Sequence, residues 1–128
     1  MGKMSRNKGA SFEREIAKVM RAVWPDARRG GGDQAGPMGR PDVDGTPYWI
    51  ECKRYANVTR AIVKGAHQQA QDAAIRARDS RPVLVVTRSD RRPAVAHFEV
   101  LWTVSSESLV SALLVSVPLL EWMEAWDD

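Results

Sequence analysis

An aspartate, a glutamate and a lysine occur close together in the stretch from residue 41 to residue 53, which reads Pro-Asp-Val-Asp-Gly-Thr-Pro-Tyr-Trp-Ile-Glu-Cys-Lys. The three residues are Asp42, Glu51 and Lys53. Carboxylate oxygens are hard ligands that suit Mg²⁺, with Mn²⁺ as a substitute. A lysine beside such a metal can position an attacking water and stabilise negative charge, while the metal acts as a Lewis acid. The pattern therefore predicts metal-dependent hydrolysis of a phosphodiester bond.

The spacing of these residues indicates how they meet. Side chains alternate between the two faces of a strand, so Glu51 and Lys53 share one face. The Asp44-Gly45 pair is a turn signal between two strand-like runs, and it predicts a hairpin. Such a hairpin brings Asp42 across from Glu51, so that the two carboxylates converge.

Neighbouring groups extend the candidate site, and a simpler interpretation stands beside it. The backbone carbonyl of Cys52 offers the metal a third oxygen, and Arg54 adds a cation that can hold a phosphate. The thiol of Cys52 is expected to point into the core and to be inert. The alternative is an exposed hairpin with ordinary surface charges, in which a pair between Glu51 and Lys53 carries little energetic weight.

The rest of the sequence predicts a mixed α/β domain that holds this hairpin in place. Residues 1–9 are interpreted as a flexible basic arm, and a helix is expected over residues 11–23, capped by Ser11 and stopped before Pro25. Residues 28–41 contain five glycines and two prolines and predict a mobile loop. The further expected elements are a helix over residues 60–78, strands over 83–87, 94–102 and 113–117, a turn or helix start at 105–108, and a final helix from Pro118.

Charge and composition narrow the class of protein. The chain has 128 residues, one cysteine and a net charge of +3. Residues 1–92 carry 19 basic and 10 acidic residues, whereas residues 93–128 carry six acidic residues and no basic one. A concentrated basic surface is typical of proteins that bind polyanions, with a solvated basic face as the alternative. The single cysteine and the absence of a run of ~18 apolar residues predict a soluble, cytoplasmic protein without a membrane span.

Several segments around the hairpin follow one another in a recognisable order. Residues 8–15 read Lys-Gly-Ala-Ser-Phe-Glu-Arg-Glu, and a glycine-rich loop follows. Then come Gly-Arg-Pro-Asp at 39–42, Ile-Glu-Cys-Lys-Arg at 50–54, and a glutamine in the next helix, Gln69. These motifs resemble the PD-(D/E)XK nuclease superfamily and, within it, the archaeal and phage Holliday-junction resolvases. The resemblance covers about residues 5–90 and implies a restriction-endonuclease-like α/β core, with a mixed central sheet flanked by helices.

The resemblance also implies an activity and a set of roles. The protein would be a Mg²⁺-dependent DNA endonuclease that acts as a homodimer on four-way junctions. Asp42 and Glu51 would bind the metal, and Lys53 would be the catalytic lysine. Glu13 would reach the metal from the first helix, directly or through water, and Gln69 would help to order the site. The basic side chains that would hold the DNA backbone are Lys8, Arg14, Arg28, Arg29, Arg40 and Arg54.

Several alternatives stay open. Gln68 and Gln71 are alternatives to Gln69 for the glutamine that orders the site. Glu13 could instead be a solvent-facing residue whose carboxylate interacts favourably with the dipole at the start of its helix. The glycine-rich loop lacks the serines that are usual in the family, and the segment from about residue 101 onward matches no pattern of the family. A restriction- or repair-type nuclease of the same fold, a non-catalytic DNA-binding module, and a protein that binds a partner through its acidic C-terminal segment are the competing functions. The compact size and the resemblance point to a phage or mobile-element origin.

Overall fold

The structure is a computed structural model that describes residues 2–30, 39–103 and 110–126. Its helices are α1 (Gly2–Met20), α2 (Arg60–Arg76) and α3 (Leu119–Glu124). Its strands are β1 (Arg28–Arg29), β2 (Val43–Asp44), β3 (Trp49–Tyr55), β4 (Val83–Ser89), β5 (Val95–Thr103) and β6 (Val110–Pro118). The predicted turn at 105–108 and most of the predicted loop at 28–41 lie outside the described residues. The loop prediction was wrong at its start, where Arg28–Arg29 form β1. None of the described helices has the length and apolar character needed to cross a membrane.

The strands form one mixed sheet in the order β1-β2-β3-β4-β5-β6. β3 and β4 are parallel, and the remaining neighbours are antiparallel. Parallel neighbours need a long connection, and α2 supplies it between β3 and β4. The predicted α/β architecture, a mixed sheet flanked by helices, is confirmed.

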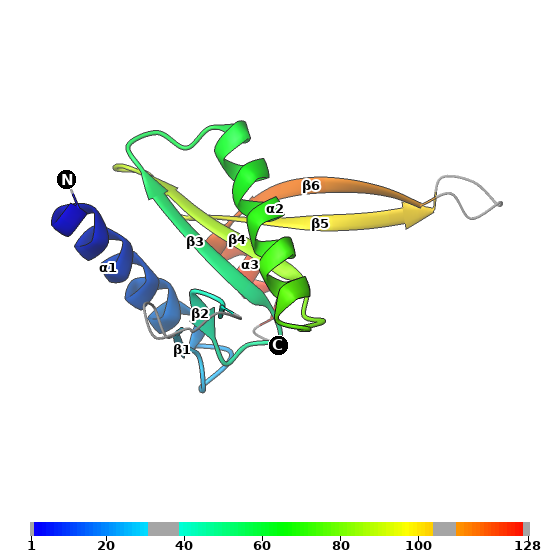
Figure 1. The fold of residues 1–128 in the computed structure, drawn as a ribbon, viewed down its shortest axis with the longest axis horizontal. Coiled ribbons are helices and arrows are strands. Elements are labelled where there is room, and N and C mark those ends of the chain that lie inside the picture. Colours follow the sequence, from blue (N-terminus) through cyan, green and yellow to red (C-terminus); the bar gives the residue numbers. More distant parts are fainter. Residues whose placement is uncertain (1, 31–38, 104–109, 127–128) are drawn as a thin grey trace.

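Helices cover both faces of the sheet (Figure 1). Residues of α1 and α3 pack with alternate residues of β3 and β4, and we call this side the α1–α3 face. Residues of α2 pack with the intervening residues of the same strands, and we call this side the α2 face. The alternation predicted for β3 is confirmed, because Ile50 and Cys52 belong to the first cluster and Trp49 belongs to the second.

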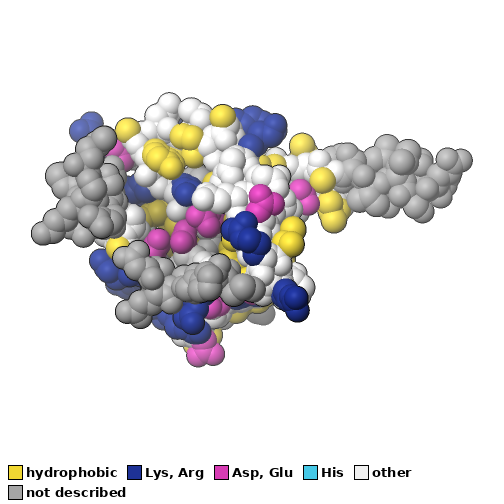
Figure 2. Space-filling view, in the orientation of Figure 1, with side chains coloured by type: hydrophobic (Ala, Val, Ile, Leu, Met, Phe, Trp, Pro, Cys, Tyr) yellow, Lys and Arg dark blue, Asp and Glu magenta, His cyan; other side chains and the backbone are white. Residues whose placement is uncertain are grey.

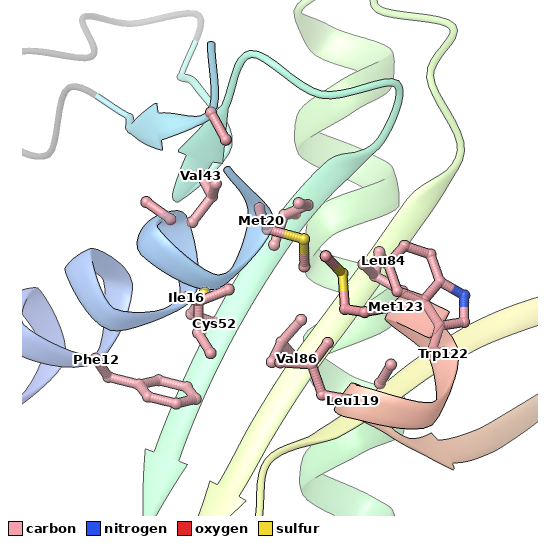
Figure 3. Packing of buried hydrophobic residues seen from close by; sticks show 14 residues of the cluster. Phe12, Ile16, Met20, Val43, Cys52, Leu84, Val86, Leu119, Trp122 and Met123 are labelled. Atoms are coloured by element: carbon pink, nitrogen blue, oxygen red, sulfur yellow. The ribbon is translucent and has the colours of Figure 1, made fainter. Parts of the chain in front are cut away.

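The larger core lies on the α1–α3 face (Figure 3). Phe12, Ile16 and Met20 recur at helical spacing along α1 and are almost fully buried. They meet Leu84 and Val86 of β4, which are both 0% exposed. The core on the α2 face is smaller and is built mainly from alanines of α2, which let the helix approach the sheet closely.

The first helix begins earlier than predicted. α1 starts at Gly2 and ends at Met20, so residues 2–9 are helical and do not form the predicted arm, and the predicted span of 11–23 was wrong at both ends. The segment before Ser11 contains no proline and several lysine, arginine and methionine residues, which favour a helix. The helix therefore continues through the position that was predicted as its cap.

Two glycines fit the hairpin against the rest of the chain. Gly45 has a φ of +80°, which favours glycine, and a Cβ there would collide with the carbonyl of Asp26. A Cβ on Gly30 would collide with the carbonyl of Pro41. The Gly30 N–H donates to the Asp42 carbonyl at 2.8 Å, so this close approach holds the start of the hairpin beside β1.

The C-terminal segment contributes to the same sheet and core as the hairpin. β5 and β6 form a long hairpin that projects from the body of the molecule, and α3 returns to it (Figure 1). Trp122 and Trp126 contact Trp24 and Tyr48, with ring centroids 5.3 to 5.9 Å apart. The two strands and the final helix that the sequence predicted here are confirmed, and the helix completes the core.

Candidate active site

The hairpin brings the two predicted carboxylates together. Asp42 immediately precedes β2, and its N–H donates to the Ile50 carbonyl at 2.8 Å, which continues the ladder between β2 and β3. Its Oδ2 accepts a hydrogen bond from the Cys52 N–H, also at 2.8 Å. The side chain of Glu51 lies close enough to act on that of Asp42 electrostatically. The convergence that the spacing predicted is therefore present.

The two carboxylates hold their charges at a cost. Burial and the neighbouring charge of Glu51 raise the pKa of Asp42 to about 7. Burial also raises the pKa of Glu51, although the nearby Lys53 opposes this shift. Two partly buried carboxylates that repel each other form a site that a cation would stabilise.

Lys53 lies on the same face of β3 as Glu51. Its Nζ is 3.5 Å from Glu51 Oε1, and its side chain is 26% exposed. The ammonium group therefore stands beside the carboxylates and remains accessible from solvent. Two carboxyl groups therefore stand beside one ammonium group at this site.

Glu13 approaches the hairpin from α1. Its Oε2 accepts a hydrogen bond from Arg29 Nε at 2.7 Å, which ties α1 to β1. Burial raises the pKa of Glu13, and the charge of Asp42 acts in the same direction. Glu13 is thus close enough to affect the carboxylates electrostatically, and its partner Arg29 is engaged in an ion pair.

The backbone carbonyl of Cys52 faces the same region. The N–H and C=O of one strand residue point to the same edge of the strand. Since the Cys52 N–H meets Asp42, the Cys52 carbonyl is directed to the edge of β3 where Asp42 lies. The thiol points into the core on the α1–α3 face, as predicted. Burial raises its pKa well above the usual value, which keeps it protonated.

These donors fit a hard divalent cation. Two carboxylates and one carbonyl supply oxygen ligands of the type that Mg²⁺ and Mn²⁺ prefer. Across the part of the chain that the structure describes, no three side chains of His, Cys, Asp or Glu are grouped as a metal site. A third protein ligand would therefore be the Cys52 carbonyl, or Glu13 through a water, and the remaining positions would be filled by water or substrate.

The competing glutamines of α2 lie on different flanks of the helix. Gln68 and Gln71 border a hollow between α2 and β6, and Gln68 donates to Asp72. Gln69 follows the buried Ala66 by three residues, is exposed, and does not border that hollow. No hydrogen bond within the described residues joins Gln69 to Asp42 or Glu51. The role predicted for Gln69 therefore stays a prediction, with Gln68 and Gln71 as alternatives.

The predicted DNA-binding side chains differ in their surroundings. Arg54, whose side chain is 26% exposed, has Nε 3.8 Å from Asp90 Oδ1. Arg29 is held by Glu13, and the side chain of Lys8 lies outside the described residues. The remaining predicted contacts are exposed, and they are Arg14, Arg28 and Arg40. In Figure 2, which keeps α2 in front of the sheet, acidic side chains lie beside basic ones near the middle of the visible face.

A buried polar chain on the α2 face was not predicted from the sequence. His97 Nε2 is 2.7 Å from Thr87 Oγ1, and His97 Nδ1 is 2.6 Å from Ser116 Oγ. Thr87 pairs in register with Lys53, so these hydrogen-bonded side chains begin on the strand next to the candidate active site. Alternation within each strand places these residues on one face, but only the register between strands joins them.

The chain was also compared with known proteins. No protein-family model matches it, and no curated protein matches its sequence. Among solved structures, it is similar to Hjc, a Holliday junction resolvase from the archaeal hyperthermophile Archaeoglobus fulgidus. The two sequences are 15% identical, the match covers 91% of this chain and 98% of that chain, and the TM-score is 0.44. A likeness of this degree is too low to transfer an activity.

Proposed function

We propose that this protein is a metal-dependent endonuclease that hydrolyses phosphodiester bonds of DNA, with Mg²⁺ as the metal and Mn²⁺ as a substitute. The observation that carries the proposal is the convergence of Asp42 and Glu51 beside Lys53. Residues 1–92, which include this site, have 19 basic and 10 acidic residues, and this excess of positive charge suits a polyanionic substrate.

The side chains would divide the work. Asp42 and Glu51 would hold the metal together with the Cys52 carbonyl. A divalent metal bound there supplies Lewis acidity and lowers the pKa of a bound water. Lys53 would place its ammonium group near the scissile phosphate and stabilise the negative charge that develops in the transition state. Glu13, held by Arg29, would orient a water at the edge of the site.

The finer proposal is a homodimer that cuts four-way DNA junctions. It is supported by the order of the sequence motifs from residue 8 to residue 54, which resembles that of Holliday-junction resolvases. Arginines at the rim of the site would contact phosphates, which carry no base sequence, so selectivity would come from the shape of the DNA. Gln69 would help to order the site from α2.

The proposal is tested by cleavage of a labelled four-way junction and a linear duplex of matched sequence. The protein is assayed with Mg²⁺, with Mn²⁺ and with EDTA, and wild type is compared with Asp42→Asn. Asp26→Asn is the matched control, because Asp26 is exposed and its side chain lies outside the site. We expect paired, symmetric nicks in the junction, which disappear with EDTA and in Asp42→Asn and persist in Asp26→Asn.

Other results would redirect the proposal. Equal cutting of junction and duplex would keep the nuclease and remove the junction selectivity, in favour of a restriction- or repair-type enzyme. Tight DNA binding without any cutting, together with no heat of Mn²⁺ binding in calorimetry, would indicate a non-catalytic DNA-binding module. Sedimentation of the free protein tests the dimer separately.

A further inference from the structure

A cavity of about 250 Å³ lies on the α2 face, between the start of α2 and strands β4, β5 and β6. Its wall includes the polar chain of Thr87, His97 and Ser116. Thr87 and His97 are 2% and 6% exposed, so two polar side chains are buried at its base. Buried polar groups of this kind require hydrogen-bond partners. Counting which of these groups donate and which accept shows the type of ligand that the cavity can bind.

The imidazole leaves one hydroxyl proton unused. Burial lowers the pKa of His97 to about 4, so the ring is neutral at physiological pH and has one donor and one acceptor. One of the two hydroxyls, Thr87 or Ser116, donates to the ring, and the other accepts from it. The hydroxyl that accepts still carries its own proton, and no hydrogen bond of the described residues uses that proton.

Two further hydroxyls on the wall are in the same state. Thr59 Oγ1 accepts from the Ile62 N–H at 3.3 Å, and Ser89 Oγ accepts from the Val58 N–H at 2.9 Å. Each of them is used as an acceptor, and no bond in the described part of the chain uses its proton. The cavity is therefore bordered by hydroxyl groups that can each donate a hydrogen bond to a ligand.

The charges around the cavity have one sign. Arg60 and Arg92 line it, and none of its described lining residues is acidic. Neither arginine takes part in an ion pair within the described residues. The first turn of α2 also lies here, without an acidic side chain, and its dipole adds positive potential. Hydroxyl donors, guanidinium groups and positive potential all suit a ligand that only accepts hydrogen bonds and carries negative charge.

We infer that this cavity binds a phosphate group of the DNA strand that is cleaved, beside the scissile phosphate. The inference rests on the proposed function. Lys53 and Thr87 are paired in register on parallel strands about 4.8 Å apart, and both belong to the α2 face. Room for about eight waters, at ~30 Å³ each, suits a phosphodiester group. The cavity is thus a second phosphate site next to the metal site.

The test measures how DNA binding depends on salt. Fluorescence anisotropy of a labelled junction and duplex is recorded in EDTA at several NaCl concentrations, for wild type and for Arg60→Gln/Arg92→Gln. The control is Arg76→Gln/Arg78→Gln, because both residues are exposed at the other end of α2 and the charge change is the same. Losing one duplex phosphate contact makes the negative slope of log K against log salt less steep by about 0.9. This change weakens binding roughly eightfold at 0.1 M salt.

We expect this loss in the cavity variant and not in the control variant. Equal slopes in wild type and the cavity variant, with wild-type cleavage intact, would overturn the phosphate site and leave the nuclease standing. Equal losses in both variants would also overturn it, because the effect would then be general electrostatics. A loss confined to the cavity variant, in a protein that does not cut DNA with Mg²⁺, would support phosphate binding and refute the nuclease.

Discussion

The two faces of the central sheet are built from the same strands and have opposite characters. On the α1–α3 face, β3 and β4 contribute Ile50, Cys52, Leu84 and Val86, which two helices cover. On the α2 face, β3 contributes the apolar Trp49 and then Glu51 and Lys53. β4 changes in the same way, from valines to Thr87.

This difference shows how a small domain can combine a packed core on one face of its sheet with a polar site on the other. The alanines of α2 pack closely over the apolar half of the α2 face, and the polar half faces cavities and solvent. We therefore expect the stability of the domain to depend mainly on the α1–α3 face. The α2 face carries the candidate chemistry, at a cost in buried and mutually repelling charges. The following changes test this division.

The largest effect is expected from Glu51→Gln. Removing one of the two carboxylates proposed to bind the metal should lower the cleavage rate on the order of 10³-fold, equivalent to about 4 kcal/mol in the barrier. The free energy of unfolding of the metal-free protein should not fall, because a repelling charge is lost. Glu15→Gln is the control, since Glu15 is an exposed partner of Arg88. Cleavage kinetics and urea denaturation measure the two quantities, and wild-type activity in Glu51→Gln would refute the site.

Leu84→Ala changes the α1–α3 face and should lower the free energy of unfolding, which Glu51→Gln should not. Leu84 is 0% exposed, and deleting its side chain leaves a cavity that lowers the free energy of unfolding by about 2–5 kcal/mol. Leu120→Ala is the matched control, because Leu120 is 68% exposed and its loss should change stability by less than ~0.5 kcal/mol. Urea denaturation compares the two, and similar values would contradict the proposed division.

His97 should make the α2 face sensitive to acid. Its pKa is about 4 in the folded protein and about 6.5 in the unfolded chain, so between these values the unfolded chain binds more protons. This contribution, ~3 kcal/mol, is present above pH 6.5 and lost as pH falls toward 4. Stability against pH is measured for wild type and His97→Gln, and the difference between the curves isolates the imidazole. Parallel curves would show that His97 titrates normally.

The smallest effect is expected from Arg29→Gln. The ion pair with Glu13 is partly exposed, with 38% of the Arg29 side chain accessible, so its loss should lower the free energy of unfolding by less than about 1 kcal/mol. The difference from wild type should shrink in 1 M NaCl, where charges are screened within ~3 Å. Denaturation at low and high salt measures it, and a salt-independent loss of several kcal/mol would mean that Arg29 supports the fold by packing.

The local pattern of the sequence was sufficient to predict the hairpin and its carboxylates. Asp44-Gly45 set the turn, and the period of two along β3 set which side chains share a face. These are properties of neighbouring residues, so they need no knowledge of the rest of the chain. The same holds for α2, whose predicted start at residue 60 is the observed one, and for the buried run that became β4.

Other features were decided by tertiary structure. The contact of Glu13 with Arg29 depends on how α1 packs against β1. The chain from Thr87 through His97 to Ser116 depends on the register of β4, β5 and β6, which turns and packing set over long separations. Local spacing thus determined which side chains meet at the hairpin, and only the assembled sheet brought distant polar residues to one face.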